Sequence, residues 1–263
     1  MLKEERSVSL PNPFDFTGKI VLLTGAVGGL GRSVCIAFAR AGAQVVIFDI
    51  NEKALTAVEK EIKDSVAALV DTAKVDLCSE TDVKESVNRV CEKFGKIDVL
   101  VNLVGGIVRK PSVNYPLEEW QHVMDINLKA CWLCCQAVGK VMLKQKYGRI
   151  VNFSSNAGLH GNRGYPAYGP AKAGVIALTR VLAVEWGPNG IATNAIAPGF
   201  TKTPFNEEIL SDPKMTERIL GRLPFGQILP DDAMVGPTLF LASEAARWVN
   251  GHTLHVDSGF NIT

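Results

Sequence analysis

The amino-acid sequence predicts an α/β protein with a single-domain Rossmann fold, a doubly wound parallel sheet of about seven strands with helices on both faces. Two observations lead to this prediction. Short, β-branched and nearly continuous apolar segments alternate with segments of helical periodicity from about residue 19 to the end of the chain. No linker, repeat or low-complexity run divides the 263 residues. Strands that alternate with helices are typical of parallel sheets built from βαβ units.

The expected strands are apolar on both faces, as in a parallel sheet that helices cover on both sides. They lie at residues 19–25, 44–49, 97–102, 149–154, 189–199 and 252–259, and a further strand ends at Asp76. The expected helices lie roughly at residues 29–41, 52–63, 80–94, 117–145 and 167–187. Each helix therefore connects two strands of one sheet.

Residues 199–230 differ from the rest of the chain because prolines interrupt a segment of mixed character. These prolines are Pro204, Pro213, Pro224 and Pro230. The segment is too long for an ordinary connection, and long loops in compact domains tend to be lids or binding loops. We therefore expect one domain over residues 1–263, with a substrate lid at about 199–230.

Composition excludes several classes of partner. The net charge is +1, so nothing indicates binding to nucleic acid or to an anionic membrane surface. No run of eighteen apolar residues predicts a membrane span, and residues 1–16 lack the apolar core of a signal peptide. We expect a cytoplasmic protein.

The six cysteines are expected to be reduced thiols that pack in the core. Cys131 and Cys134 have C-x-x-C spacing, but they lie in an apolar helical stretch without a second pair or a nearby histidine. Packing is favoured over metal or redox chemistry at such a place. No metal site is predicted.

A glycine-rich turn follows the first expected strand and opens a helix. It contains Gly25, Gly29 and Gly31, with Leu30 between the last two, and it departs from the literal G-x-G-x-x-G spacing. Glycines let the backbone approach a pyrophosphate, whose charge is favoured at a helix N-terminus. Glycine turns of this kind also serve simple packing, so the motif alone does not identify a cofactor.

The end of the second expected strand indicates which cofactor binds. Asp49 lies eighteen residues after Gly31, where a carboxylate can bind the adenosine ribose hydroxyls and repel a 2′-phosphate. The nearby Arg32 lies inside the helix, where a salt bridge or solvation is the expected role. NAD is therefore preferred to NADP. Asp76 either contacts the adenine amino group or only ends its strand.

Tyr168 and Lys172 are four residues apart in an expected helix, so their side chains share one face. A phenol is a poor base near neutral pH, and a neighbouring ammonium group favours the phenolate. The pair could therefore serve general acid–base catalysis. The same spacing also occurs by chance on amphipathic helices.

Four motifs in this order resemble the short-chain dehydrogenase/reductase family over about residues 17–260. They are Thr24-Gly25-x-x-x-Gly29-x-Gly31, Ser155 thirteen residues before the tyrosine, Tyr168-x-x-x-Lys172 and Asn194-x-x-x-Pro198-Gly199. The resemblance implies that Tyr168 is the acid–base and that Lys172 lowers its pKa and binds the nicotinamide ribose. It also implies that Ser155 orients the substrate oxygen.

The same resemblance extends the site beyond these three residues. It implies that Asn127 belongs to a proton relay and that Asn102, Pro198, Gly199 and Thr203 lie at the cofactor. One departure is the sequence Asn102-Leu103-Val104-Gly105, where the family usually has Asn-Asn-Ala-Gly. The family commonly forms tetramers through helices that match 117–145 and 167–187, so we expect a homotetramer.

The substrate is the least defined part of the prediction. Arg109, shortly after the expected strand at 97–102, could bind a substrate carboxylate or could be a solvated surface cation. His160, Asn162 and Arg163 could bind hydroxyls or could belong to a solvated loop. Local sequence resembles the branch of the family that acts on sugar acids, such as gluconate 5-dehydrogenases. This favours a small hydrophilic sugar acid or polyol.

Two other functions stay open from the sequence. One is the reduction of 3-oxoacyl thioesters on acyl carrier protein, or of another small ketone, because such reductases share much of the same background. The other is a cofactor-binding regulator without catalysis. The presence of Ser155, Tyr168 and Lys172 together argues against the regulator.

Overall fold

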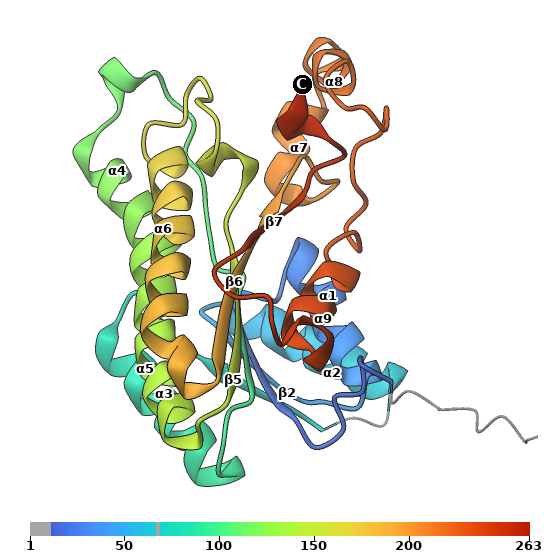
Figure 1. Ribbon diagram of the computed structural model, residues 1–263. Coiled ribbons are helices and arrows are strands. Elements are labelled where there is room, and N and C mark those ends of the chain that lie inside the picture. Colours follow the sequence, from blue (N-terminus) through green and yellow to red (C-terminus); the bar gives the residue numbers. More distant parts are fainter. Residues whose placement is uncertain (1–11, 67–68) are drawn as a thin grey trace, which may run out of the picture.

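The computed structural model describes residues 12–66 and 69–263, and its centre is a seven-stranded sheet (Figure 1). The strand order is β3-β2-β1-β4-β5-β6-β7, and all neighbouring strands are parallel. The strands are β1 Ile20–Thr24, β2 Gln44–Asp49, β3 Val70–Lys74, β4 Val99–Asn102, β5 Gly148–Phe153, β6 Ile191–Pro198 and β7 Thr253–Val256. This order confirms the doubly wound Rossmann-type fold. Residues 1–11, which carry most of the segment expected not to be a signal peptide, lie outside the described part.

The strands follow the apolar segments of the sequence. All residues of β1, β4, β5 and β6 are buried, because helices cover both faces of the sheet there. The exception is β3, whose sequence VDTAK is polar and only partly buried. As an edge strand it pairs with β2 alone, which relaxes the demand for apolar residues. It ends at Lys74, two residues before Asp76, where the sequence was expected to end it.

The helices form two layers, one on each face of the sheet (Figure 1). One layer contains α1 Gly29–Arg40, α2 Glu52–Ser65 and α9 Val235–Ala242, and an apolar core joins these helices to the sheet. The opposite layer contains α3 Glu80–Phe94, α4 Leu117–Met124, α5 Ala130–Gln145 and α6 Tyr168–Trp186. Its own core joins the sheet to α3, α5 and α6. Apart from α9, which the sequence did not predict, the helices agree closely with the expected segments.

The expected helix 117–145 contains a local departure. Between α4 and α5 the chain forms a π-helical turn, η2 Asp125–Lys129, with Asn127 at its centre. A π turn inserts an extra residue into the helix and is frequent at functional sites. No sequence signal for this turn was identified.

Local sequence explains where two of the helices begin. The Asn51 side chain accepts a hydrogen bond from the backbone amide of Ala54 at the start of α2. Ser79 does the same for Asp82 at the start of α3. Such caps satisfy backbone amides that the first turn of a helix leaves free.

The carboxyl ends of β1 and β4 lie side by side in the sheet. The chain leaves β1 toward α1 on one face, and after β4 it continues to helices on the other face. This reversal separates the two connections and leaves a crevice at that edge, where open α/β sheets bind their ligands. The candidate site is therefore expected at this edge.

The segment after β6 contains a 3-10 turn, η5 Pro204–Asn206, and two short helices, α7 Glu207–Leu210 and α8 Pro213–Leu220. Ile219 and Leu223 form a small apolar cluster with Phe260 near the C-terminus. Figure 1 shows α7, α8 and the C-terminus together at one end of the molecule. The proposed lid is thus packed on the C-terminal tail.

The cysteines occur as free thiols, as expected. They are Cys35, Cys78, Cys91, Cys131, Cys134 and Cys135, of which the second and third are half-buried and the others buried. Within residues 12–66 and 69–263, no helix is long and apolar enough to cross a membrane.

Candidate active site

The glycine-rich turn requires glycine for steric reasons. Gly25 and Gly29 have φ angles of +67° and +43°, a region that side chains disfavour. A Cβ atom on Gly31 would lie 2.5 Å from the Cα atom of Ala26, so the start of α1 packs directly on the loop. Gly28 faces open space instead. The turn therefore presents bare backbone to the crevice.

This turn is suited to the pyrophosphate of a dinucleotide. Gly28 caps α1 without a side-chain hydrogen bond to its first turn, which leaves backbone amides for an anion. Leu30 lies at the same end of α1, and it lines the cavity together with Gly25, Gly29 and Gly31. Thr203 lies across the cavity, with its Cγ2 atom 3.2 Å from the position of a Cβ on Gly29.

Asp49 ends β2 with its side chain largely buried. Its carboxylate accepts the backbone amide of Asn51 at 2.9 Å and also the amide of Val27 in the glycine-rich turn. Burial raises the pKa of the carboxyl, and the backbone amides oppose this. Arg32 forms two hydrogen bonds, of 2.5 and 2.6 Å, with Glu61 on α2. The salt bridge expected for Arg32 is therefore confirmed.

Asn102 and Asp76 do not line the cavity as the structure describes it. Asn102 is buried, accepts a hydrogen bond from Thr24 at 3.0 Å and donates one to Asn152 at 2.9 Å, so it joins β1, β4 and β5. Asp76 is exposed and accepts the backbone amide of Cys78 at 2.9 Å, which fits the alternative that it only ends its strand. A contact of either residue with a cofactor stays a prediction.

The departure at Leu103-Val104 is accommodated by packing. Leu103 lines the cavity, and the backbone of Val104 would lie 2.4 Å from a Cβ on Gly25. The two chain segments therefore touch directly at the carboxyl ends of β1 and β4. Apolar contact replaces the side-chain hydrogen bonds that an asparagine at position 103 could make.

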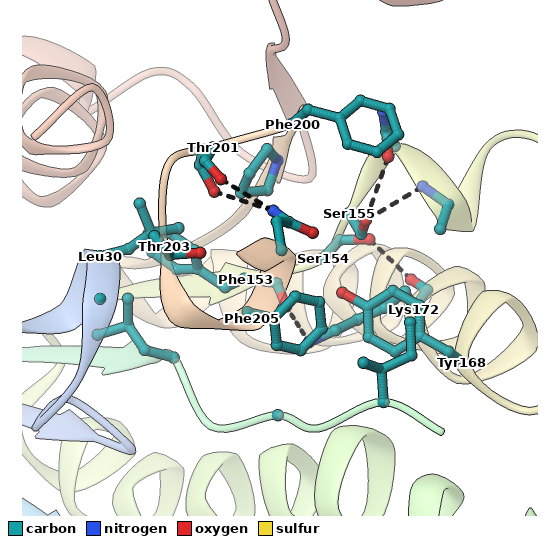
Figure 2. Close-up of a pocket in the computed structure, with 18 of the residues that line it drawn as sticks. Leu30, Phe153, Ser154, Ser155, Tyr168, Lys172, Phe200, Thr201, Thr203 and Phe205 are labelled. Atoms are coloured by element: carbon teal, nitrogen blue, oxygen red, sulfur yellow. Dashed lines mark hydrogen bonds between the residues drawn. The ribbon is translucent and has the colours of Figure 1, made fainter. Parts of the chain in front are cut away.

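The predicted trio of Ser155, Tyr168 and Lys172 lines one cavity (Figure 2). Ser155 follows β5 at the carboxyl edge of the sheet, and Tyr168 and Lys172 occupy the first two turns of α6. The Lys172 Nζ atom donates to the carbonyl of Phe153 at 2.9 Å and lies 5.8 Å from the centre of the Tyr168 ring. The three residues that were predicted from their spacing in the sequence are therefore close together in the structure.

Neighbouring serines have different partners. The Ser155 hydroxyl accepts the backbone amide of Ala157 at 3.1 Å and donates to the Asn156 Oδ1 atom at 3.3 Å. Ser154 donates to the backbone carbonyl of Lys172 at 2.8 Å, which is the backbone-binding role that suits a serine at a strand end. Ser155 is therefore the serine whose hydroxyl is placed for chemistry.

Burial shifts the pKa values of both titratable members of the trio. It raises the pKa of Tyr168 to about 12, against an opposing effect of the Ser155 hydroxyl. It lowers the pKa of Lys172 to about 8. In each case burial disfavours the charged form. Near neutral pH Tyr168 is therefore a neutral phenol, the form that the predicted acid role requires.

Asn127 lies behind the trio in the π turn. Its Nδ2 atom donates to the carbonyls of Gly106 at 2.7 Å and Val123 at 2.8 Å, while the buried Oδ1 atom has no partner among the residues described. A Cβ on Gly105 would lie 2.7 Å from this Oδ1 and 3.2 Å from the Lys172 Nζ. Asn127 and Lys172 thus approach the same point, as a relay requires.

The segment after β6 supplies the opposite wall of the cavity. Pro198, Gly199 and Thr203 line it, together with Phe200 and Phe205. A Cβ atom on Gly199 would lie 2.7 Å from the backbone directly after β7, so the two chain segments are in close contact there. The predicted cofactor residues of this segment therefore lie in the same cavity as the trio.

Arg109 lies behind the wall of this cavity. Its guanidinium donates to the Tyr165 hydroxyl at 3.2 Å and to the Phe205 carbonyl at 3.4 Å, and it pairs with the Glu208 carboxylate at 3.5 Å. The Phe205 ring packs beside Tyr168, with 5.8 Å between ring centres (Figure 2). Arg109 therefore connects the proposed lid to the candidate active site and already binds a carboxylate.

Of the other substrate candidates, Asn162 lines the cavity, whereas His160 and Arg163 are not among its described lining residues. The His160 ring contacts the Asn261 side chain and packs edge-on against Phe260, so it joins the loop after β5 to the C-terminal tail. Arg163 is exposed. A role of either residue in substrate binding stays a prediction.

Several lining residues were not found from the sequence. Phe200 and Phe205 lie in a segment without periodicity, and their packing partners are distant along the chain. Asn156 was also missed, although its place directly after Ser155 is a signal that could have found it.

Comparison with known proteins agrees with this geometry. A family model described as enoyl-(acyl carrier protein) reductase matches residues 25–261. The chain is 37% identical to a 3-oxoacyl-(acyl-carrier-protein) reductase of Thermotoga maritima, over 93% of this chain and 98% of the relative. It is 35% identical to a 2-dehydro-3-deoxy-D-gluconate 5-dehydrogenase of Bacillus subtilis, over 95% and 98%. A gluconate 5-dehydrogenase from Burkholderia cenocepacia, solved in complex with NADP and tartrate, superposes with a TM-score of 0.92 at 30% identity, over 95% and 98%.

Proposed function

This chain belongs to the short-chain dehydrogenase/reductase family, and we propose that it transfers a hydride between NAD and a small hydrophilic alcohol or ketone of the sugar-acid or polyol class. The observation that carries the proposal is the convergence of Ser155, Tyr168 and Lys172 on one cavity at the carboxyl edge of the sheet. The glycine-rich turn borders the same cavity, which supports a dinucleotide as the cofactor.

Each residue of the trio has a role that its position supports. The bound nicotinamide would exchange the hydride with the substrate carbon. Tyr168 donates a proton to the substrate oxygen in reduction and accepts it in oxidation. Ser155 orients that oxygen by hydrogen bonding. Lys172 binds the nicotinamide ribose and, with Asn127, connects Tyr168 to the proton supply.

The preference for NAD over NADP rests on Asp49. Its carboxylate lies beside the glycine-rich turn, where it can accept hydrogen bonds from ribose hydroxyls and repel a phosphate. The cation of Arg32 is paired with Glu61 and is not available to a phosphate without breaking that pair. The solved gluconate 5-dehydrogenase contains NADP, so the preference of this chain has to be measured separately.

The position of Arg109 supports the proposal that the substrate carries a carboxylate group. The guanidinium lies next to Tyr165 and Phe205, which line the cavity, and its carboxylate partner Glu208 is exposed and exchangeable. A substrate carboxylate could replace Glu208, because guanidinium and carboxylate groups pair in the same geometry whatever their source. Two of the relatives named above are dehydrogenases of sugar acids by name, and one of them was solved with tartrate.

A second candidate is the reduction of a 3-oxoacyl thioester on acyl carrier protein. The relative from Thermotoga maritima carries this activity in its name, at 37% identity. The trio and the cofactor residues serve both reactions equally. The two candidates therefore differ only in what the rest of the cavity accepts.

The test is a substrate panel on the purified protein. We expect NADH formation with sugar acids and polyols, and weaker NADH oxidation with a 3-oxoacyl thioester. The opposite ranking would establish the second candidate.

Tyr168→Phe should abolish turnover and leave the NAD dissociation constant nearly unchanged; near-normal turnover in this variant would refute the assigned chemistry. Tight NAD binding without turnover on any compound would indicate a cofactor-binding regulator.

We also propose a homotetramer assembled through α4, α5 and α6. Two valines on α6, Val181 and Val184, are 50% and 78% exposed, and Trp132 on α5 is 39% exposed. Apolar side chains exposed along neighbouring helices are typical of subunit interfaces. Light scattering on the purified protein tests this state. The lid at 199–230 and the cytoplasmic location stay predictions.

A further inference from the structure

The wall of the cavity contains a polar side chain that the proposed chemistry does not use. Asn156 follows Ser155 directly, begins the 3-10 turn η3 Asn156–Gly158, and is only 7% exposed. It lines the same cavity as Tyr168. An amide buried at this point must find hydrogen-bond partners or destabilise the protein.

Among the described residues, only the oxygen of the Asn156 side-chain amide has a hydrogen-bond partner. The Oδ1 atom accepts the hydroxyl of Ser155 at 3.3 Å. The Nδ2 atom is buried and has no hydrogen-bond partner in the described parts of the chain. A buried donor without a partner costs about 1–3 kcal/mol, and it is tolerated where a ligand supplies the missing acceptor.

The position of this donor limits which substrate atom it can reach. Ser155 and Tyr168 hold the oxygen of the reacting carbon, and Asn156 is hydrogen-bonded to Ser155. The next oxygen available to an adjacent donor is therefore one on the neighbouring carbon of the substrate. A neutral amide donor matches a neutral hydroxyl there.

We propose that Asn156 is a specificity-determining residue that binds a hydroxyl on the carbon next to the reacting carbonyl, so that the site selects α-hydroxy ketones and the corresponding vicinal diols. This inference rests on the proposed hydride transfer and narrows its substrate class. A ketone without the neighbouring hydroxyl leaves the Nδ2 donor unpaired in the complex, which disfavours its turnover.

Two matched ketones provide the test. Acetoin and butanone have the same four-carbon skeleton and differ in one hydroxyl next to the carbonyl. The ratio of their kcat/KM values with NADH, acetoin over butanone, is measured for the wild type, Asn156→Leu and Asn156→Asp. Leucine removes both ends of the amide, whereas aspartate keeps an acceptor for Ser155 and removes the donor.

We expect the ratio to fall by about tenfold to a hundredfold in both variants. The hydroxyl also activates the carbonyl chemically, but that effect is identical for all proteins and cancels in the comparison. Asn114→Asp is the matched control, because it makes the same substitution at an exposed asparagine that is not among the described lining residues of the cavity. It should leave the ratio unchanged. Circular dichroism and NAD binding establish that each variant is folded.

The outcomes separate this inference from the function on which it rests. A wild type that reduces neither ketone nor any compound of the panel would refute the hydride-transfer proposal. Turnover of both ketones with a ratio that Asn156→Leu and Asn156→Asp leave unchanged would refute the role of Asn156 alone. An equal fall in Asn114→Asp would also refute it, because the effect would then come from the added charge and not from the loss of a donor in the cavity.

Discussion

Burial of the charged Lys172 side chain should lower the free energy of unfolding of the cofactor-free protein. Lys172 is 4% exposed, and burial lowers its pKa from the ordinary 10.5 to about 8. At 1.36 kcal/mol for each pKa unit, this difference corresponds to about 3 kcal/mol of unfavourable free energy at pH 7. Lys172→Met removes the charge and keeps most of the apolar volume of the side chain.

The substitution also has a cost. The carbonyl of Phe153 loses the donor that lies 2.9 Å away, and an unpaired buried carbonyl costs about 1–2 kcal/mol. The two effects together predict that Lys172→Met is about 1–2 kcal/mol more stable than the wild type at pH 7. The same variant should lose turnover, because the site then lacks its cation.

The difference in stability between Lys172→Met and the wild type should change sign with pH. Because the pKa is lower in the folded protein, the unfolded chain binds the additional proton between about pH 8 and 10.5, and wild-type stability rises with pH across this window. The lost hydrogen bond does not change with pH. The advantage of Lys172→Met should therefore vanish between about pH 9 and 10 and reverse above it.

Urea unfolding of the cofactor-free protein at pH 7 and at pH 10, at one protein concentration, measures both effects. Lys140→Met, at an exposed lysine on α5, is the control and should show no such dependence on pH. If Lys172→Met were less stable than the wild type by the same amount at both pH values, burial of the charge would not be the dominant effect.

Two further predictions concern cofactor and substrate. Asp49→Ala should lower the ratio of kcat/KM for NAD over that for NADP, measured with one substrate, because the repelling carboxylate is gone; an unchanged ratio would assign the discrimination to another group. Arg109→Ala should raise KM by about tenfold or more for carboxylated substrates and leave uncharged polyols nearly unaffected. Glu208→Gln should lower KM for the carboxylated compounds, because it removes the competing carboxylate, and a uniform change across the panel would contradict the carboxylate-binding role.

The sequence was sufficient to predict the fold because the fold depends on local patterns. The residues of β1, β4, β5 and β6 are mostly apolar and do not alternate with exposed polar residues, as burial on both faces demands. The edge strand β3 was located less well, since its polar residues carry no such signal. The π turn around Asn127 breaks a helix whose periodicity continues on both sides, so nothing local reveals it.

The candidate site was predictable where spacing determines geometry. Tyr168 and Lys172 share a helix face, and Ser155 follows the strand that precedes this helix. Contacts over long sequence distances were not predictable. The pairing of Arg109 with Glu208, and the contact of His160 with Asn261, connect residues about a hundred positions apart. These contacts determine which side chains remain free for a substrate.

Burial also changes how the Tyr168–Lys172 pair must work. The sequence suggested that the ammonium group of Lys172 lowers the pKa of the phenol. In the cofactor-free protein the pKa of Tyr168 is about 12 and that of Lys172 about 8, so as the pH rises the lysine loses its proton first. A phenolate paired with an ammonium group is therefore not formed by these two residues alone.

A positive charge entering the cavity beside Tyr168 would favour its phenolate directly and would also favour the neutral amine of Lys172, which lies 5.8 Å from the Tyr168 ring. The oxidised nicotinamide carries such a charge and the reduced form does not. Oxidation of an alcohol needs the phenolate and uses the oxidised cofactor, whereas reduction of a ketone needs the neutral phenol and uses the reduced one. We therefore expect the protonation state of Tyr168 to follow the redox state of the bound cofactor.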